Sequence, residues 1–391
     1  MKMYTDKEPL CIIHAHQTWL YQTENWIYNQ IRNLPDWVRS HVVCSERINP
    51  EEYSWPRLYV YPKISSWRYY WRYGRGTRRV RRRPAFLGWL IDKEGGQILH
   101  SHFGYEGWAN LRAARQLGLR HVVTFYGVDV NLYPKQYPIW RERYRELFEQ
   151  VEAVLCEGPH MAECIRELGC PENKVRVHHL GISVEEITFK PRLWQEGQVL
   201  RVLIAASFKE KKGIPDALEA LGSLPNGASL EITIIGDARN ESRSQEEKNK
   251  IMNTIEHYGL KDKVRMLGFQ PHEVFLQEAY KNHIFLSPSI TASDGDTEGG
   301  APVSLIEASA SGMQIVSTKH CDIPNVVLDG KSGLLAEEGN VAGLTTKLQW
   351  LIDNSGQWAT LAQAGREHMD SQFNGQVQGQ KLAAIYQDII N

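Results

Sequence analysis

The sequence predicts an α/β protein built from two doubly wound parallel-sheet domains. Short β-branched runs alternate with longer amphipathic segments along the whole chain, and they form two series separated by the polar stretch 185–197. The length of 391 residues also exceeds what a single hydrophobic core usually supports. Strands separated by helices are joined by right-handed crossovers, so we expect parallel sheets that helices cover on both faces.

The predicted strands fall into two series in chain order. The first comprises 10–15, 57–61, 97–102, 121–126, 152–157 and 175–180, and the second comprises 199–207, 230–236, 263–268, 283–289 and 313–318. We expect one domain at 1–185, a second at 186–371 and a final amphipathic helix within 372–391. Open α/β sheets bind ligands beyond the carboxyl ends of their strands, so we expect a ligand cleft between the two domains.

The composition is that of an ordinary globular protein. Hydrophobic residues make up 42% of the chain and charged residues 23%, with a net charge of -1. We find no apolar run long enough to span a bilayer and no signal-peptide pattern at the N-terminus, so we expect a cytoplasmic protein. The six cysteines have irregular spacing that matches neither a metal site nor a disulfide framework, so we expect buried free thiols.

The segment 294–312, DGDTEGGAPVSLIEASASG, has the pattern of a loop that leads into a helix. Gly299 and Gly300 allow the backbone to approach a ligand closely or to take a positive φ. Pro302 suits the first position of a helix, and the helical pattern runs from Ala301 to Gly312. A helix that starts behind a glycine-rich turn presents free N–H groups and a positive dipole end, and these bind phosphate.

Acidic side chains accompany this predicted phosphate site. Glu298 lies in the loop and Glu307 within the helix, and carboxylates suit sugar hydroxyls because they accept hydrogen bonds. Asp294 and Asp296 have two interpretations, a Mg²⁺ site beside a diphosphate or a turn held by Asx hydrogen bonds. Since lysines and helix N-termini already serve a diphosphate, we expect no metal.

Two further loops of the second series suit a nucleotide. The segment ASFKEKKG (206–213) follows a predicted strand, and Lys212 is its best candidate for a diphosphate ligand, as a point charge at a helix entrance. The alternative is a solvated basic loop. Gly236 and Asp237 end the next strand and form either a nucleoside-binding edge or a simple turn.

In the first series, HSHFG (100–104) and TFYGVD (124–129) lie at predicted strand ends. His102, Tyr126 and Asp129 are therefore candidates for a reacting centre, although a histidine in this position is often only a structural hydrogen-bonding group. Glu24 follows the first strand and either lines the cleft or caps a helix.

A basic window stands out between 63 and 86. It holds nine basic residues and no acidic ones, whereas the rest of the chain sums to -10, because the whole chain has a net charge of -1. Arginine with tryptophan and tyrosine suits an anionic membrane surface, single-stranded nucleic acid or a solvated loop. Nothing else in the chain fits a nucleic-acid module, so we favour peripheral membrane docking and expect no nucleic-acid partner. The predicted docking residues are Arg68, Trp71, Arg72, Arg78 and Arg79.

These motifs together resemble a known family. The segments QTENWIYNQI, HSHFG, TFYGVD, VHHLGIS, KEKKG and IIGDA, and above all DGDTEGGAPVSLIEASASGMQIVSTKHCDIPNVVLDGKSGLLA (294–336), are similar to the retaining, nucleotide-sugar-dependent glycosyltransferases of family 4. Those enzymes have the GT-B fold, and the similarity is greatest to the branch that builds bacterial exopolysaccharides of the colanic acid type. The resemblance covers nearly the whole chain.

The resemblance implies a nucleotide diphosphate-sugar donor in the second domain, an acceptor in the first, and a final helix that crosses back to the first. By matching position, Lys212 binds the diphosphate, Glu307 holds the ribose hydroxyls and Glu298 touches the transferred sugar. The segment from Gly299 to Val303 offers backbone N–H groups. No cofactor is implied besides this co-substrate.

Three departures from the family pattern stand out. Eight residues separate Glu298 from Glu307 where the family usually has seven, so either the loop bulges or Gly299 takes the first glutamate's place. The family's donor-loop arginine aligns with Ser207, so one cation for the diphosphate is missing unless Lys209 or Lys211 replaces it. The histidine that the family usually has in the cleft is Tyr126 in this chain.

The sequence therefore predicts a retaining, metal-independent sugar transfer to the hydroxyl of a glycan or lipid-linked acceptor, by front-face attack. Two alternatives stay open on this evidence. One is a sugar-nucleotide epimerase of the same fold, and the other is a non-catalytic nucleotide-sugar binding protein, which the departures at Ser207 and Tyr126 allow.

Overall fold

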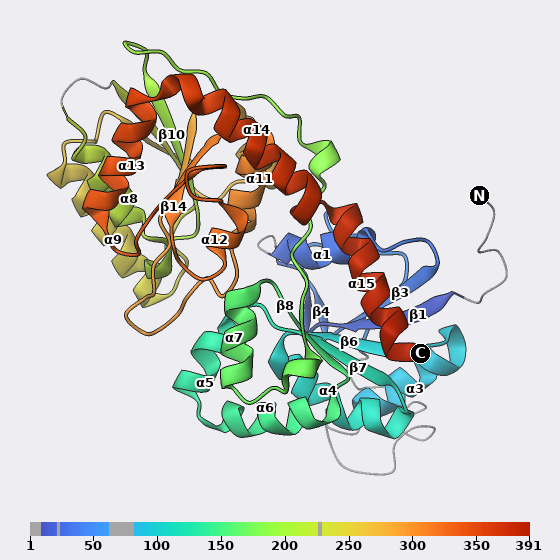
Figure 1. Ribbon diagram of the computed structural model, residues 1–391. Helices are drawn as coiled ribbons and strands as arrows, with labels where there is room; N and C mark the ends of the chain where they lie inside the picture. Colours follow the sequence, from blue (N-terminus) through green and yellow to red (C-terminus); the bar gives the residue numbers. More distant parts are fainter. Residues whose placement is uncertain (1–8, 22–23, 62–81, 226–228) are drawn as a thin grey trace, which may run out of the picture. The chain divides into compact units, whose positions relative to one another are not determined.

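The computed structural model describes residues 9–21, 24–61, 82–225 and 229–391. The chain forms two compact units (Figure 1), unit 1 from 1–181 with 375–391 and unit 2 from 182–374. The predicted α/β class is confirmed for both units. The chain passes between them after Gly181 and after Asn374, a few residues from the predicted boundaries at 185/186 and 371/372.

Unit 1 contains a parallel sheet with the strand order β5-β3-β1-β6-β7-β8-β9. Its strands are β1 (Leu10–Ala15), β3 (Val38–Cys44), β5 (Leu58–Val60), β6 (Ile98–His102), β7 (Arg120–Thr124), β8 (Ala153–Cys156) and β9 (Val175–Val177). A separate short parallel pair joins β2 (Thr18–Trp19) to β4 (Glu46–Arg47). The sequence missed β3, because Arg39, Ser40 and His41 interrupt its apolar run.

Helices cover both faces of this sheet. Ile12 of β1 packs with Leu382 and Tyr386 of the C-terminal helix, whereas the next residue, Ile13, packs with Leu90 on the opposite face. This alternation is what a strand buried on both sides requires. The helices of unit 1 are α1 (Asn25–Arg32), α3 (Arg82–Glu94), α4 (Gly104–Leu117), α5 (Tyr133–Gln136), α6 (Ile139–Gln150), α7 (Pro159–Glu167) and α15 (Gly375–Ile390).

Unit 2 contains a second parallel sheet, with the order β12-β11-β10-β13-β14-β15. Its strands are β10 (Leu200–Ala205), β11 (Leu230–Ile235), β12 (Val264–Met266), β13 (Ile284–Ser287), β14 (Gln314–Thr318) and β15 (Leu334–Ala336). The first five match the predicted second series. The sequence missed β15, whose three residues are too short to show a period.

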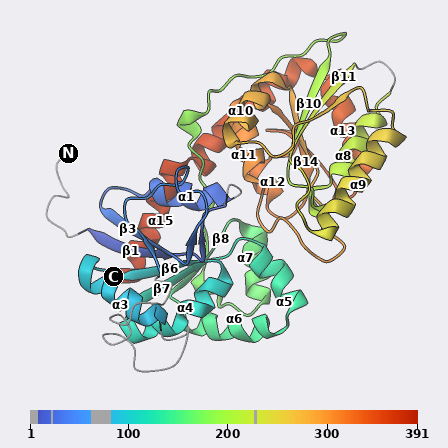
Figure 2. The same ribbon diagram turned by 180° about the vertical axis from the view of Figure 1, so that it is seen from behind.

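The helices of unit 2 also form two layers (Figure 2). One hydrophobic cluster joins the sheet to α8, α9 and α13, and another joins it to α10, α11 and α12. Val202 and Ile204 of β10 belong to the first cluster and Leu203 to the second. The helices are α8 (Ile214–Gly222), α9 (Ser242–His257), α10 (His272–Lys281), α11 (Val303–Ser311), α12 (Ile323–Val326), α13 (Val341–Asp353) and α14 (Trp358–His368).

Each sheet has a point at which the strand order reverses. In unit 1 the chain builds outward from β1 through β3 to β5 and then returns to place β6 on the other side of β1. In unit 2, β10 is flanked in the same way by β11 and β13. Loops that leave adjacent strands in opposite directions open a crevice there, so these two switch points are the expected ligand sites of the two units.

The polar stretch 185–197 is part of unit 2 and is not the free linker that its composition predicts. Trp194 packs in the core of that unit. Arg192 is buried and donates hydrogen bonds to the carbonyl oxygens of Lys190, Ala279 (2.7 Å) and Ser311 (2.6 Å). The guanidinium group thereby binds carbonyl groups at the ends of α10 and α11, which a cation stabilises.

Within the described part of the chain, none of the helices combines the length and the apolar character needed to cross a membrane. All six cysteines are free thiols. Four of them are buried, as expected, whereas Cys164 and Cys321 are partly exposed.

Candidate functional site

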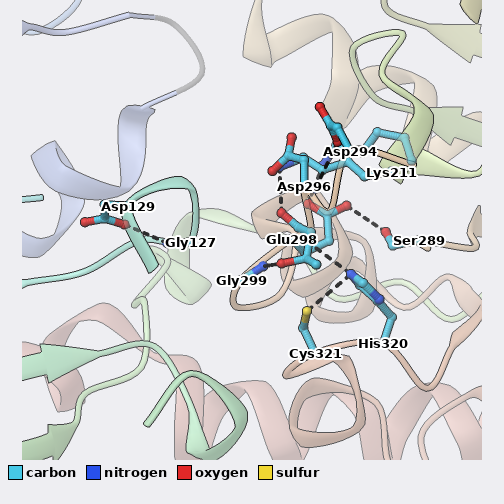
Figure 3. A network of polar contacts seen from close by, with 12 residues as sticks. Gly127, Asp129, Lys211, Ser289, Asp294, Asp296, Glu298, Gly299, His320 and Cys321 are labelled. Carbon is cyan, nitrogen blue, oxygen red and sulfur yellow. Dashed lines mark hydrogen bonds and ion pairs between the residues drawn. The ribbon is translucent and has the colours of Figure 1, made fainter. Parts of the chain in front are cut away.

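The loops at the carboxyl edge of the unit 2 sheet meet at its switch point (Figure 3). One loop follows β10 and carries Lys211 and Lys212, and another follows β13 and carries Glu298. The loop after β14 brings His320 against the second. Strands that are distant in sequence thus place two lysines, a carboxylate and an imidazole together.

Lys212 and Glu298 form a buried ion pair. The Lys212 Nζ lies 2.7 Å from one Glu298 carboxylate oxygen, and the Ser289 hydroxyl donates to the other at 2.7 Å. Only 6% of the Glu298 side chain is exposed. Burial alone raises the pKa of this carboxyl, but Lys212 and Lys211 outweigh it and lower the pKa to about 2. The Glu298 carboxylate is therefore ionised at neutral pH.

The two aspartates of the DGD turn are also matched with cations. Lys211 Nζ lies 3.1 Å from Asp296 and donates to the Thr297 carbonyl oxygen at 2.7 Å. Asp294 pairs with Arg243 and accepts a hydrogen bond from the Asp296 N–H at 3.0 Å. These contacts fit the Asx-turn interpretation of the segment. They also commit Lys211 to the loop, so it is less available to replace the missing arginine at Ser207.

The glycine turn before α11 differs from the prediction in one detail. α11 begins at Val303, with Pro302 as its N-terminal cap residue, and not at Ala301. Pro302 has extended backbone angles, and Gly299 takes a positive φ of 77°. Glu298 itself faces Lys212, and Gly299 takes the positive φ that the turn requires; which of the two residues matches the family's first glutamate stays a prediction.

Glu307 is buried in α11, and its Oε1 lies 2.8 Å from His272 Nε2 at the start of α10. The His272 side chain is about half exposed (45%), so the pair connects the interior to the surface. The sequence did not single out His272, because a histidine after a proline and before a helix is unremarkable without its partner in space.

Gly236 lies where the prediction requires a close backbone approach. A Cβ atom there would come within 1.9 Å of the Ala206 carbonyl oxygen, so only glycine fits beside the loop after β10. Asp237 accepts a hydrogen bond from Lys248 at 2.7 Å, which lowers its pKa. The Ser207 carbonyl accepts from the Lys209 N–H at 2.8 Å. All three predicted residues thus lie on the carboxyl edge of the sheet.

In unit 1, Asp129 organises the turns after β6 and β7. Its carboxylate accepts backbone N–H groups from Gly104 (2.7 Å), Tyr126 (3.0 Å) and Gly127 (3.1 Å), the last drawn in Figure 3. Burial raises its pKa to about 6, although these hydrogen bonds act in the opposite direction. Because backbone donors occupy both oxygens, the geometry favours a structural role over the predicted reactive one.

The Asp129 contacts surround a strained residue. Phe103 has φ 73° and ψ 143°, a region that side chains other than glycine rarely occupy. Its N–H donates to the Thr124 carbonyl oxygen at 2.8 Å, and the following N–H, of Gly104, is bound by Asp129. Such strain persists only where neighbours enforce it, and it concentrates at functional sites. The strained turn lies at the carboxyl end of β6, beside the switch point of unit 1.

His102 and Tyr126 belong to one buried hydrogen-bond chain. His178 donates from Nε2 to the Gln378 carbonyl (3.0 Å), so its Nδ1 accepts from the Gln30 amide (3.2 Å). The Tyr126 hydroxyl donates to Gln30 Oε1 (3.3 Å) and accepts from His102 Nδ1 (2.6 Å). His102 Nε2 then accepts from His14 Nδ1 (3.2 Å). Each group has one consistent proton assignment when all imidazoles are neutral.

Burial keeps these imidazoles neutral. It lowers the pKa of His14 to about 3 and holds the pKa of His102 and His100 well below the usual value. His100 bonds Tyr386 of α15 and Thr124 of β7, both at 2.6 Å. The catalytic roles predicted for His102 and Tyr126 stay predictions, and their contacts show a network that joins α15 to the sheet.

Glu24 pairs with a histidine that the sequence did not single out. Its Oε2 lies 3.3 Å from His16 Nε2, at the carboxyl end of β1. Glu24 is the N-terminal cap residue of α1 and its side chain makes no hydrogen bond to that helix, but its Oε2 accepts the Tyr21 N–H at 3.4 Å, so both predicted roles of Glu24 stay predictions. His16 Nδ1 is buried without a hydrogen-bond partner among the described residues. The His16 ring also stacks on the ring of Phe103 in the strained turn, with the two ring centroids 5.3 Å apart.

Two further regions bear on the predictions. The membrane-docking residues Arg68, Trp71, Arg72, Arg78 and Arg79 lie outside the described residues. A cavity of about 590 Å³ opens beside Arg192, Arg201, Lys281 and His283 of unit 2. Arg201 lies at the amino-terminal end of β10 and His283 directly precedes β13, so this cavity lies away from the predicted site residues at the carboxyl edge.

Comparison with known proteins gives a consistent result. Residues 186–368 match the family described as glycosyl transferases group 1, and residues 23–186 match glycosyltransferase family 4. The amylovoran biosynthesis glycosyltransferase AmsK of Erwinia amylovora is 34% identical over 77% of this chain and 72% of its own length. WcaL of Escherichia coli strain K12, named for colanic acid biosynthesis, is 31% identical over 81% of this chain and 76% of its own.

Solved structures agree on the fold. Anabaena Alr3699/HepE in complex with UDP-glucose superposes with a TM-score of 0.76 over 97% of this chain and 100% of its own, at 16% identity. A glycosyltransferase from Rickettsia africae gives 0.76 over 98% and 100%, at 15% identity. At this level of identity the likeness supports the two-domain α/β fold alone.

Proposed function

This chain belongs to the glycosyltransferases of group 1 and family 4, and from that premise we propose a retaining transfer from a nucleotide diphosphate-sugar to an acceptor hydroxyl. The names of AmsK and WcaL, which refer to amylovoran and colanic acid biosynthesis, support a saccharide precursor as the acceptor. The observation that carries the proposal is the buried Lys212–Glu298 pair at the switch point of unit 2, beside the start of α11.

Lys212 is the proposed diphosphate ligand. In the free protein its charge is matched by Glu298, so the site holds a cation without an unbalanced buried charge. A diphosphate in front of α11 meets the first N–H groups of that helix and the positive end of its dipole. When Lys212 turns to the diphosphate, Glu298 is released to accept hydrogen bonds from hydroxyls of the transferred sugar.

Glu307 is the proposed ribose ligand. Its carboxylate is held by His272 at 2.8 Å and accepts hydrogen bonds from vicinal hydroxyls. A nucleoside whose ribose lies at Glu307 and whose phosphates lie at Lys212 runs along the start of α11. This placement accounts for both predicted carboxylates in one donor.

The proposed reaction breaks the bond between the anomeric carbon and the diphosphate oxygen and forms a bond to the acceptor oxygen on the same face. The hydroxyl proton passes to the leaving diphosphate. Lys212 and the α11 N-terminus stabilise the developing charge of the diphosphate as fixed charges that need no reorganisation. Because Asp294 and Asp296 are paired with Arg243 and Lys211, we propose that the reaction needs no metal.

The acceptor is proposed to bind unit 1 at its switch point. Glu24 orients His16 there, and His16 Nδ1, which has no hydrogen-bond partner among the described residues, offers an acceptor for a hydroxyl group. Peripheral docking on an anionic membrane through the basic window stays part of the proposal for lipid-linked acceptors. Deletion of residues 65–83 tests that part, because unchanged vesicle binding and unchanged activity on lipid acceptors would remove it.

A thermal-shift screen against a panel of nucleotide sugars, with UDP and UDP-glucose as first probes, tests the donor proposal. A ligand at a hundred times its Kd stabilises the folded protein by roughly 2.7 kcal/mol. No shift with any nucleotide sugar would overturn the proposal. Incubation with the donor alone identifies an epimerase if an isomeric nucleotide sugar forms. Tight donor binding with no turnover on any acceptor identifies a binding protein.

A further inference from the structure

His320 binds the backbone of the loop that carries Glu298. The Glu298 N–H donates to His320 Nε2 at 3.2 Å, and His320 Nδ1 lies 2.8 Å from a carboxylate oxygen of Glu338 (Figure 3 shows the first contact). Since Nε2 accepts, the neutral ring must carry its proton on Nδ1 and donate it to Glu338. The Cys321 thiol, 3.2 Å from the same Nε2, is a further donor. One tautomer therefore satisfies every contact.

Glu338 ties down the other end of the same loop. Its second carboxylate oxygen accepts the Thr291 N–H at 2.5 Å. Burial acts to raise the pKa of Glu338, but the hydrogen bonds from His320 and Thr291 keep it below the usual value, so the acceptor stays ionised. The imidazole and the carboxylate thus fix residues 291 and 298 from outside, while the side chain of Glu298 points to Lys212.

The side chain of His320 is only 1% exposed, so it does not reach a ligand directly. Its effect on the site passes through the Glu298 peptide, whose side chain is the one aimed at Lys212. A shift of that peptide moves the carboxylate, and small displacements of a reacting or binding group reduce rates strongly.

We propose that His320 and Glu338 are positioning residues that hold Glu298 for the transferred sugar. This inference rests on the proposed function of Glu298. It assigns a positioning role to His320, in the loop after β14, and to Glu338, and the sequence alone indicates this role for neither residue. The contacts of His320 and Glu338 affect binding of the transferred sugar and not of the nucleotide, because Lys212 reaches the diphosphate from the loop after β10.

Substitutions of similar size separate the two contacts of His320, the one with the Glu298 N–H and the one with the Glu338 carboxylate. In His320→Gln the side-chain amide extends to the position of Nε2, so it keeps an acceptor for the Glu298 N–H. In His320→Asn the shorter amide keeps a donor near Nδ1 for Glu338 but leaves the Glu298 N–H without an acceptor. Glu338→Gln removes one of two acceptors. Lys319→Ala is the matched control, because its ion pair with Glu337 is exposed.

We expect His320→Asn to lower kcat about tenfold and to weaken UDP-glucose binding about as much, the size of one hydrogen bond, with the Kd of UDP unchanged. His320→Gln and Lys319→Ala should stay within about threefold of the parent protein. Amide hydrogen exchange of 291–298 should speed up in His320→Asn and in Glu338→Gln but not in His320→Gln.

Equal behaviour of the Asn and Gln variants in binding and in exchange would overturn the inference. So would a loss of UDP affinity equal to the loss of UDP-glucose affinity, because that reports general damage to unit 2. If the parent protein binds neither UDP nor UDP-glucose, the donor proposal fails for this probe, and the exchange experiment still decides whether His320 and Glu338 fix the loop.

Discussion

Replacement of Lys212 by methionine tests how much the Lys212–Glu298 ion pair contributes to the stability of unit 2. Methionine keeps most of the length and apolar stem of lysine but removes the charge that lies 2.7 Å from Glu298. The Glu298 carboxyl is then buried without its main cation. Its pKa, about 2 in the parent protein against an ordinary 4.5, should return toward or above the ordinary value.

The magnitude follows from that shift. A lowering of the pKa from 4.5 to about 2 corresponds to about 3 kcal/mol. Lys211 and Ser289 supply part of it, so we expect Lys212→Met to destabilise unit 2 by about 2–3 kcal/mol at pH 7. A carboxyl with a lowered pKa stabilises the fold above its unfolded pKa. That stabilisation is lost as the pH falls from about 4.5 to about 2. The difference between parent and variant should therefore shrink across that window.

Urea unfolding at pH 7 and at pH 3, followed by a signal from unit 2 such as the fluorescence of Trp194 and Trp358, measures this difference. Lys248→Met is the matched control, because its pair with Asp237 is about one-third exposed and should contribute less than about 1 kcal/mol. The same Lys212 variant should lose about a hundredfold in kcat if the lysine stabilises the leaving diphosphate. An unchanged urea midpoint at pH 7 would refute the account of the ion pair, whatever the activity.

Three other predictions follow from the structure. Glu298→Gln should leave the affinity for UDP unchanged or tighten it, because Lys212 no longer has a competing carboxylate, while sugar transfer falls; isothermal titration that shows weaker UDP binding would contradict this. Arg192→Met should destabilise unit 2 by about 3–5 kcal/mol in urea unfolding, because several buried carbonyl oxygens lose a charged donor, and a loss below about 1 kcal/mol would contradict it. Unit 1 should lose stability below about pH 6.5, by up to about 1.4 kcal/mol per pH unit for each buried histidine, because unfolding releases His14, His100 and His102 to take up protons. A pH-independent urea midpoint between pH 6.5 and 4.5 would argue against that last assignment.

The fold and the location of the loops at the carboxyl edge of the unit 2 sheet were predictable because they depend on local patterns. Alternating β-branched and amphipathic runs report the period of each element, and a parallel sheet places every strand's carboxyl end at one edge. The loop after β10 and the loop after β13 could therefore be assigned to one site before their contacts were known. Gly236 was also predicted in this way, because a close approach of two backbone segments requires glycine.

The structure changed the interpretation of residues whose roles depend on partners distant in sequence. His102, Tyr126 and Asp129 stand at strand ends as expected, but their polar atoms are taken by Gln30, by backbone N–H groups and by other histidines. A sequence gives the types of these groups and not the direction in which they point. For the same reason the sequence did not single out His16, His272 and His320. Each of them is a candidate only because a carboxylate elsewhere in the sequence pairs with it.

The segment 294–312 shows the division most clearly. The sequence by itself determined that a glycine-containing loop with a carboxylate leads into a helix with a second carboxylate, because glycine, proline and helix-forming residues follow one another in a fixed local order. The tertiary structure decided that Glu298 faces Lys212, that Gly299 takes a positive φ and that His320 accepts the Glu298 N–H. Those contacts join β10, β13 and β14, and the register of a sheet across separate strands is set by packing of the whole core and not by any local run of residues.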